Sequence, residues 1–183
     1  MNKCIENLQY IKGIDDNCKI NLTALDIKDI DWFIGESITD YFNEYLDFKF
    51  STLCKDMKSR EKVINALREK LEACAKRINK KEKRFIIKYN GLRVGNLALS
   101  ERDKNKVEMA YYINSNVKGL GIATEAVKMF IDILEQERYK GEIYLVIQMS
   151  NKGSIKVAEK AGFKLSGCEK GKYTTNLIYS IIM

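Results

Sequence analysis

A short turn with two glycines is the part of the sequence whose residue types most directly indicate chemistry. Gly119 and Gly121 follow an apolar run at residues 109–113 and precede an apolar stripe at helical spacing, made by Ala123, Val127, Phe130, Ile131 and Leu134. The turn therefore predicts a helix N-terminus. Its unpaired N–H groups and positive dipole end attract anions, and glycines let a pyrophosphate approach that backbone closely. Lys118 could add a positive charge to this anion site.

Two glycines alone do not distinguish one kind of phosphate site from another. A dinucleotide-binding turn would have a third glycine three residues after Gly121, where Thr124 stands. We therefore regard a Rossmann site as a weak interpretation of this turn.

The composition narrows the chemistry further. The chain has no histidine, which argues against His-based triads and against most metal sites, and we expect no metal. Its cysteines are odd in number, scattered and without a Cys-x-x-Cys pair, so we expect reduced thiols. They are Cys4, Cys18, Cys54, Cys74 and Cys168. Catalysis is left to carboxylates, hydroxyls, thiols, lysines or backbone groups.

The stretch around the turn resembles the GNAT superfamily of N-acetyltransferases. The superfamily pattern Gln/Arg-x-x-Gly-x-Gly/Ala is met in part, with Lys118 first, Gly121 fourth and Ala123 sixth. The sequence motifs in the last half of the chain are most similar to those of the ribosomal-protein N-terminal alanine acetyltransferases. The shared features are a strand with Glu108, a Gly-x-Gly-x-Ala-Thr-Glu-Ala turn at residues 119–126, Asn151 with Ser154, and Glu-Lys-Ala-Gly-Phe at residues 159–163.

The resemblance implies one acetyltransferase domain over residues 1–183, with a mixed, mostly antiparallel central sheet flanked by helices. In this fold the strands ending near residues 113 and 149 splay apart, and the thioester of the cofactor acetyl-CoA lies between them. Asn151 would bind the pantetheine arm, and Ser154 would lie near the sulfur. The implied cofactor-binding residues are Tyr111, Ile113, Lys118, Gly119, Leu120, Gly121, Ile122, Ala123, Thr124, Asn151 and Ser154.

Acetyl transfer to an amine needs a neutral amine, a stabilised oxyanion and a proton for the departing thiolate. In the family's usual arrangement a strand N–H group serves the oxyanion. Glu108 is the best candidate for the general base, acting through water; the alternatives are a surface carboxylate or one paired with a lysine. Glu169, expected in the loop before the last strand, is another candidate base.

The expected acid departs from the family pattern. Many relatives place a tyrosine seven residues after the asparagine, where this chain has Ala158. Ser154 is the substitute that we predict, unless it serves only as a residue at the start of a helix.

Size and charge fit one enzyme-sized domain. With 183 residues and 45% apolar content the chain can bury a full core. The formal net charge of +7 attracts phosphorylated or acidic partners, and coenzyme A is one, so nucleic acid is not required. Apolar runs of membrane-spanning length and a signal-peptide pattern are both missing from the sequence, so we expect a cytoplasmic protein without membrane contact.

Periodicity predicts the elements before the turn. We expect a strand at residues 19–25 capped by Asp26, and one or two helices over residues 27–46 interrupted near Gly35. The next helix should start at Ser59 and bury Val63, Leu67, Leu71, Cys74 and Ile78. Cations outnumber acids between residues 58 and 88, which indicates either a solvated helix face or a face that docks on RNA or a ribosome.

Strands dominate the rest of the chain. Asn90-Gly91 predicts a type I′ turn in a hairpin, and alternation in the strand at 107–113 puts Glu108, Ala110 and Tyr112 on one face. The other expectations are hairpin strands at 85–89 and 92–99, a polar turn at 100–106, and strands at 142–149, 162–165 and 172–183.

We therefore predict an acetyl-CoA-dependent N-acetyltransferase that acts by direct attack of a primary amine. The leading acceptor is a peptide or protein N-terminal amine; the alternative is a small amine such as an amino sugar, a polyamine or an amino acid. Net positive charge disfavours a polycation. The alternative of another class is a non-catalytic acyl-CoA sensor or a basic RNA- or ribosome-binding module. A monomer or homodimer, the acyl length and the role of residues 1–17 stay open.

Overall fold

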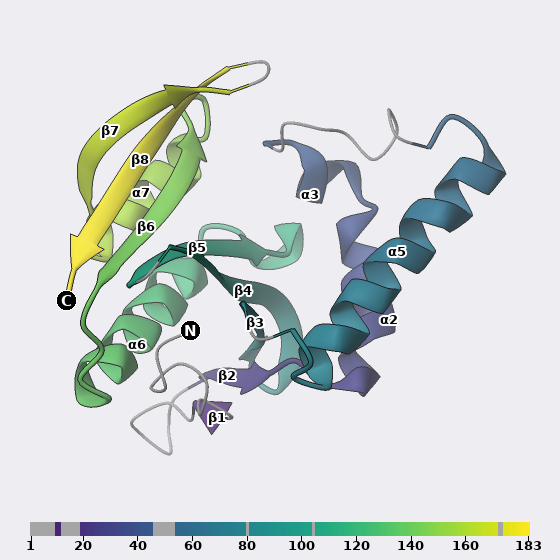
Figure 1. The fold of residues 1–183 in the computed structure, drawn as a ribbon, viewed down its shortest axis with the longest axis horizontal. Helices are drawn as coiled ribbons and strands as arrows, with labels where there is room; N and C mark the ends of the chain where they lie inside the picture. Colours follow the sequence, from purple (N-terminus) through teal and green to yellow (C-terminus); the bar gives the residue numbers. More distant parts are fainter. Residues whose placement is uncertain (1–9, 12–18, 46–53, 80, 104, 172–173) are drawn as a thin grey trace.

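The computed structural model describes residues 10–11, 19–45, 54–79, 81–103, 105–171 and 174–183 (Figure 1). Within these ranges one sheet has the strand order β1-β2-β3-β4-β5-β6-β8-β7, and only β5 and β6 pair in parallel. The strands are β1 Tyr10–Ile11, β2 Ile20–Ala24, β3 Glu82–Tyr89, β4 Leu92–Asp103, β5 Lys106–Ile113, β6 Glu142–Gln148, β7 Lys164–Lys170 and β8 Thr175–Ile182. This mixed, mostly antiparallel sheet confirms the predicted fold class and excludes a Rossmann fold.

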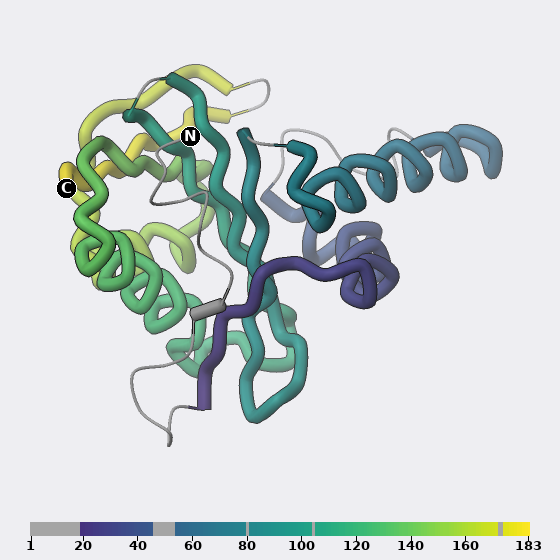
Figure 2. Tube along the Cα trace, turned by 60° about the horizontal axis from the view of Figure 1, so that its bottom comes forward, coloured from purple at the N-terminus to yellow at the C-terminus, as the bar shows by residue number. Residues whose placement is uncertain are grey.

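Helices cover both faces of the sheet. They are the 3-10 turns η1 Ile27–Asp29 and η2 Ser115–Val117, and the α-helices α2 Ile30–Ser37, α3 Asp40–Asn43, α5 Met57–Ala75, α6 Ile122–Gln136 and α7 Lys152–Lys160. Figure 2 shows α2 and α5 on one side of the strands and α6 on the other. We call these sides the α2 face and the α6 face.

Strand alternation sorts the residues onto these faces. Phe85, Leu97 and Met109 lie in the core under α6, where Phe130 is fully buried. A second core on the α2 face joins Ile86 of β3 to apolar residues of α2 and α5. In β5, register with β4 puts Glu108, Ala110 and Tyr112 on the α2 face, as predicted.

The predicted hairpin is confirmed in detail. β3 and β4 are joined by Asn90 and Gly91, whose φ angles are 49° and 80°. Both residues therefore have the left-handed conformation that a type I′ turn requires. The strand predicted at residues 19–25 is present as β2, and its Asp26 cap is confirmed because the Asp26 side chain accepts a hydrogen bond from the Lys28 N–H at 3.2 Å.

Two predicted helix boundaries were wrong. Gly35 lies within α2, and the interruption comes at Thr39, whose hydroxyl accepts from the Phe42 N–H at 3.2 Å and so caps α3. α5 begins at Met57 rather than at Ser59, because the Asp56 side chain accepts from the Ser59 N–H at 2.7 Å. In both cases a side-chain cap decides where the helix starts.

The buried stripe of α5 was predicted too long. Leu71 and Cys74 are buried as expected, but Ile78 follows the end of the helix and is exposed. Cys54, Cys74 and Cys168 are free thiols. Apart from β1, the N-terminal segment at residues 1–9 and 12–18, with Cys4 and Cys18, lies outside the described residues, as does residue 46 at the end of the predicted helical region.

The C-terminal half contains more strand than predicted. β4 continues through residues 100–103, which were expected in a turn, because their polar side chains lie at the end of a strand whose backbone pairs with β5. β7 is likewise longer than the strand predicted at residues 162–165. Glu169 therefore lies in β7, paired with Asn176 of β8, and not in a loop.

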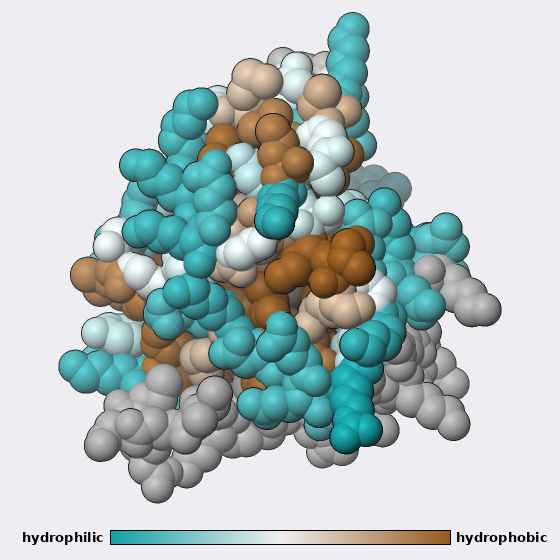
Figure 3. Space-filling model, turned by 90° about the vertical axis from the view of Figure 1, so that its left-hand side faces the viewer, coloured by the Kyte–Doolittle hydropathy of each residue, from teal (hydrophilic) through white to brown (hydrophobic). Residues whose placement is uncertain are grey.

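The edge strand β7 is exposed along its whole length. A bulge interrupts its pairing with β8 between Leu165 and Gly167, and Lys164 and Lys170 stand at its two ends. Bulges and lysines are devices that limit pairing between sheet edges of separate molecules. Figure 3 looks onto this side of the molecule, where apolar patches alternate with many hydrophilic side chains.

Candidate active site

The two central strands separate part of the way along their length. β5 and β6 pair only at Lys106, Val107 and Glu108, although β5 continues to Ile113 and β6 to Gln148. The edge of β5 that faces β6 is therefore unpaired with β6 beyond Glu108. This confirms the predicted gap between the two strands.

A glycine turn lies at the end of β5 and begins α6. Gly119 and Gly121 have φ angles of 84° and 80°, a conformation that favours glycine. Gly121 is the N-terminal cap residue of α6. Among the described residues, no atom lies within 4 Å of a Cβ added at either glycine. The turn therefore has open space beside the start of α6, where unpaired helix N–H groups can bind an anion.

The other side chains at the turn differ in where they point. Leu120 is exposed, whereas Ile122 and Thr124 are buried. The ammonium of Lys118 lies 5.3 Å from the centre of the Tyr41 ring, in a cation–π contact.

Asn151 and Ser154 meet at the start of α7. Asn151 caps this helix, and its side-chain oxygen accepts a hydrogen bond from the Ser154 N–H at 3.0 Å. Ser154 therefore lies in the first turn of α7. The side-chain amide nitrogen of Asn151 has no partner among the described residues.

Tyr111 links β5 to α7 across the gap. Its hydroxyl donates a hydrogen bond of 3.0 Å to the carbonyl oxygen of Ser154. Burial raises the pKa of Tyr111 to about 12, so its hydroxyl keeps its proton at neutral pH. Ala158, where many relatives have a tyrosine, is fully buried in the core. The phenol that reaches the first turn of α7 is instead that of Tyr111, from β5.

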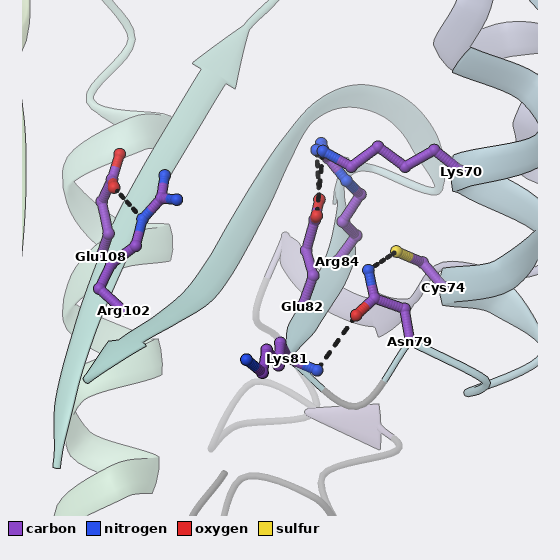
Figure 4. Close-up of polar contacts among 8 residues, drawn as sticks. All are labelled: Lys70, Cys74, Asn79, Lys81, Glu82, Arg84, Arg102 and Glu108. Carbon is purple, nitrogen blue, oxygen red and sulfur yellow. Dashed lines mark hydrogen bonds and ion pairs between the residues drawn. The ribbon is translucent and has the colours of Figure 1, made fainter. Parts of the chain in front are cut away.

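Glu108 is the last β5 residue paired with β6, and it lies on the α2 face. Figure 4 shows its carboxylate against the guanidinium of Arg102, whose Nε lies 2.7 Å from Oε2. One predicted alternative was a Glu108 carboxylate paired with a lysine. The carboxylate is paired, but its partner is Arg102. The hydrogen bond and charge of Glu108 raise the pKa of Arg102.

Sequence reasoning missed a second carboxylate on this face. Glu36 of α2 accepts hydrogen bonds from the Tyr112 hydroxyl at 2.8 Å and from the Asn114 amide at 2.9 and 3.0 Å. Burial, followed by the hydrogen bond and charge of Glu36, raises the pKa of Tyr112. These residues are more than seventy positions apart in the sequence, so local patterns carry no signal for the contact.

Aromatic rings of α3 adjoin the same place. The ring centres of Phe42 and Tyr41 lie 4.6 and 6.0 Å from that of Tyr112. Together with Glu36 they give one end of the α2 face an aromatic wall with a carboxylate in it.

A surface hollow of about 350 Å³ lies elsewhere, between β2, the end of α5 and β3. Its lining has none of the residues of the gap or the glycine turn. Among the described residues, no group of three or more Cys, Asp or Glu side chains could hold a metal ion. None of the described helices combines the length and apolar character that crossing a membrane requires.

Comparison with known proteins identifies the family. Residues 21–164 match the family model described as "Acetyltransferase (GNAT) domain". Spermidine N(1)-acetyltransferase of Escherichia coli K12 is 27% identical over 88 residues, which are 47% of each chain, so the chain spans about half the length of the curated relatives it matches.

Solved structures agree over nearly the whole fold. RimL, a ribosomal L7/L12 alpha-N-protein acetyltransferase, in complex with coenzyme A, has a TM-score of 0.76 at 15% identity, covering 96% of this chain and 98% of its own. The aminoglycoside acetyltransferase AAC(6')-Ib in complex with coenzyme A has a TM-score of 0.70 at 15% identity, covering 89% and 94%. The family match extends over well more than half of the sequence, and the chain therefore belongs to the GNAT acetyltransferase family, whose members use acetyl-CoA.

Proposed function

We propose that this protein is an acetyl-CoA-dependent N-acetyltransferase that transfers the acetyl group to a primary amine by direct attack. One observation carries the proposal: β5 and β6 separate immediately beyond Glu108, and the glycine turn that follows β5 opens into free space. A thioester in the gap would then have its phosphates at the N-terminus of α6. The proposed domain comprises residues 1–183.

The cofactor would be held mainly by backbone groups. The N–H groups of residues 119–124 would bind the pyrophosphate, where the dipole of α6 adds to their effect. Lys118 would add a positive charge. The free amide of Asn151 would bind the pantetheine arm, and the unpaired backbone edge at Tyr111 and Ile113 would bind the acyl end.

The oxyanion would be stabilised by the same edge of β5. An N–H group beyond Glu108 has no partner from β6, so it can donate to the thioester carbonyl. The donor belongs to the backbone of a strand and is already fixed by pairing with β4. Stabilisation of this kind needs no particular side chain.

Glu108 is the proposed base. Its carboxylate is held by the guanidinium of Arg102, and a water can connect it to the amine. The need for a base depends on the acceptor. An α-amine with pKa near 8 is roughly one-tenth neutral at pH 7, at a cost of about 1.4 kcal/mol, whereas a lysine with pKa near 10.4 costs about 4–5 kcal/mol.

The Ser154 hydroxyl can assist the departing thiolate. A coenzyme A thiol resembles a cysteine thiol with pKa about 8.5, so it leaves readily as an anion. The Tyr111 hydroxyl keeps its proton at neutral pH and donates a hydrogen bond to the Ser154 carbonyl oxygen, so Tyr111 positions the first turn of α7. We therefore assign to Ser154 a hydrogen bond to the thiolate rather than complete proton transfer.

The leading acceptor is a peptide or protein N-terminal amine, in line with the fold shared with RimL. A small amine is the alternative, because a relative is described as a spermidine acetyltransferase and another neighbour as an aminoglycoside acetyltransferase. Free thiols at Cys54, Cys74 and Cys168 are consistent with action in the cytoplasm.

The test is a direct search for product. The protein is incubated with acetyl-CoA and a panel of N-terminal peptides, polyamines, amino sugars and amino acids, and coenzyme A release is followed together with the mass of each amine. We expect at least one acetylated amine, and a lower rate at neutral pH for Glu108→Gln. Tight acetyl-CoA binding without product from any amine would instead indicate an acyl-CoA sensor.

A further inference from the structure

We propose that Glu36, with the rings of Tyr41, Phe42 and Tyr112, binds a second cationic group of the acceptor. The preferred acceptor would then be a primary amine that carries a second ammonium at the far end of its chain. This inference rests on the proposed function and adds the class of acceptor to it.

The charge of Glu36 is held in place but not neutralised. Its contacts in the described part of the chain are with neutral groups, the Tyr112 hydroxyl at 2.8 Å and the Asn114 amide at 2.9 and 3.0 Å. Within the described residues no lysine or arginine forms an ion pair with it. A carboxylate accepts about four hydrogen bonds, so its oxygens can also receive a cation.

The surrounding rings suit a cation. The side chains of Tyr41, Phe42 and Tyr112 are only partly buried. The centre of the Tyr112 ring lies 4.6 Å from that of Phe42 and 6.0 Å from that of Tyr41. The Lys118 ammonium lies 5.3 Å from the centre of the Tyr41 ring, a cation–π contact within the protein. A carboxylate among aromatic rings is the composition that binds ammonium groups.

The position of this subsite relative to Glu108 sets the length of the acceptor. Tyr112 and Glu108 lie on the same face of β5, four residues apart, which corresponds to about 13 Å at about 3.3 Å per residue. Ala110 lies between them and is exposed, so its small side chain leaves room along the strand. An amine reacting near Glu108 can therefore place a second cation near Glu36.

Since the net charge of +7 repels polycations, selection of a dication needs a local carboxylate such as Glu36.

The experiment compares two acceptors of equal length, diaminooctane and aminooctanol, which differ in the second cation. A charge-assisted hydrogen bond contributes about 1.5–3 kcal/mol, so the intact protein should prefer the diamine by about 10- to 100-fold in kcat/KM, mainly through KM. Glu36→Gln should remove this preference and leave aminooctanol unchanged. The matched control is Asp31→Asn, which removes an exposed carboxylate from the same helix, and it should keep the preference.

Each outcome separates the two proposals. A preference that persists in Glu36→Gln, or an equal loss for both acceptors, would overturn the subsite. If neither amine is acetylated, the proposed function fails for this acceptor class, and calorimetric binding of diaminooctane still tests the subsite. Binding by the intact protein that Glu36→Gln weakens at least about tenfold would support it, and unchanged binding would refute it.

Discussion

The ion-pair cluster at Glu82 tests how α5 is held against the sheet. Glu82 begins β3, in the same row across the sheet as Ser100 and Glu108. Its carboxylate, only 9% exposed, lies 3.0 Å from the Lys70 ammonium of α5, and its other oxygen pairs with Arg84 (Figure 4). The cluster thus ties α5 to the sheet.

The effect of Glu82→Gln can be estimated from burial. Removing one partner of a buried pair destabilises a protein by about 3–5 kcal/mol. Lys70 is half exposed and can be solvated, whereas Arg84 is only 16% exposed and would keep a largely buried, unpaired charge. We therefore expect a loss of about 2–3 kcal/mol, and a fall in Tm of about 4–12 °C for a chain of this length.

The effect should depend on pH. Burial opposes ionisation of Glu82, but the charges and hydrogen bonds of Arg84 and Lys70 prevail and lower its pKa. A carboxyl with a lowered folded-state pKa stabilises the fold above its unfolded pKa of about 4.3, and this contribution disappears as pH falls through the folded value. The difference between the intact protein and Glu82→Gln should therefore narrow below about pH 4.

Urea unfolding at neutral and acidic pH measures both quantities. The matched control is Glu72→Gln in the same helix, because Glu72 and Lys76 form a surface pair at 3.2 Å with 39% and 54% exposure, worth about 0.3–0.5 kcal/mol. Equal losses for the two variants at neutral pH would refute the reasoning about burial. A gap between Glu82→Gln and the intact protein that is the same at both pH values would refute the reasoning about charge.

Three further substitutions test the site. Glu108→Gln should lower kcat more at about pH 6.5 than at about pH 9, because alkaline solution already deprotonates the amine; an unchanged pH–rate profile would exclude Glu108 as the base. Gly95→Ala should destabilise the fold in urea, since its Cβ would clash with the Tyr112 carbonyl oxygen across β4 and β5, and unaltered stability would contradict that geometry. Tyr111→Phe removes the hydrogen bond to Ser154 and should cost about 0.5–1.5 kcal/mol in chemical unfolding; stability equal to that of the intact protein would mean that the bond contributes nothing.

Local signals explain which parts of the fold could be predicted. Asn90 and Gly91 fix their turn because few residues other than these adopt left-handed conformations, and the structure gives them φ angles of 49° and 80°. Gly121 marks the start of α6 for the same reason. The alternation that puts Glu108 on the α2 face follows from the two-residue period of a strand.

Contacts between distant residues could not be predicted in this way. Glu36 meets Tyr112 only because α2 packs against the sheet, and the two residues are 76 positions apart. Arg102, the partner of Glu108, was placed in a turn, because the polar end of β4 has the composition of a loop although its backbone is paired. The helix starts depended on capping by Thr39 and Asp56, which spacing of apolar residues does not reveal.

The measurement that tests the central claim most directly is unfolding with and without acetyl-CoA. At about a hundredfold excess over its dissociation constant, the ligand should add about 2.7 kcal/mol of stability. Gly121→Asp should abolish this gain, because it places a negative side chain where the pyrophosphate would bind. The matched control is Gly91→Asp, at a turn with the same φ of 80° and equally open space, and it should keep the gain. No gain in the intact protein, or an equal loss in both variants, would contradict a cofactor site at the glycine turn.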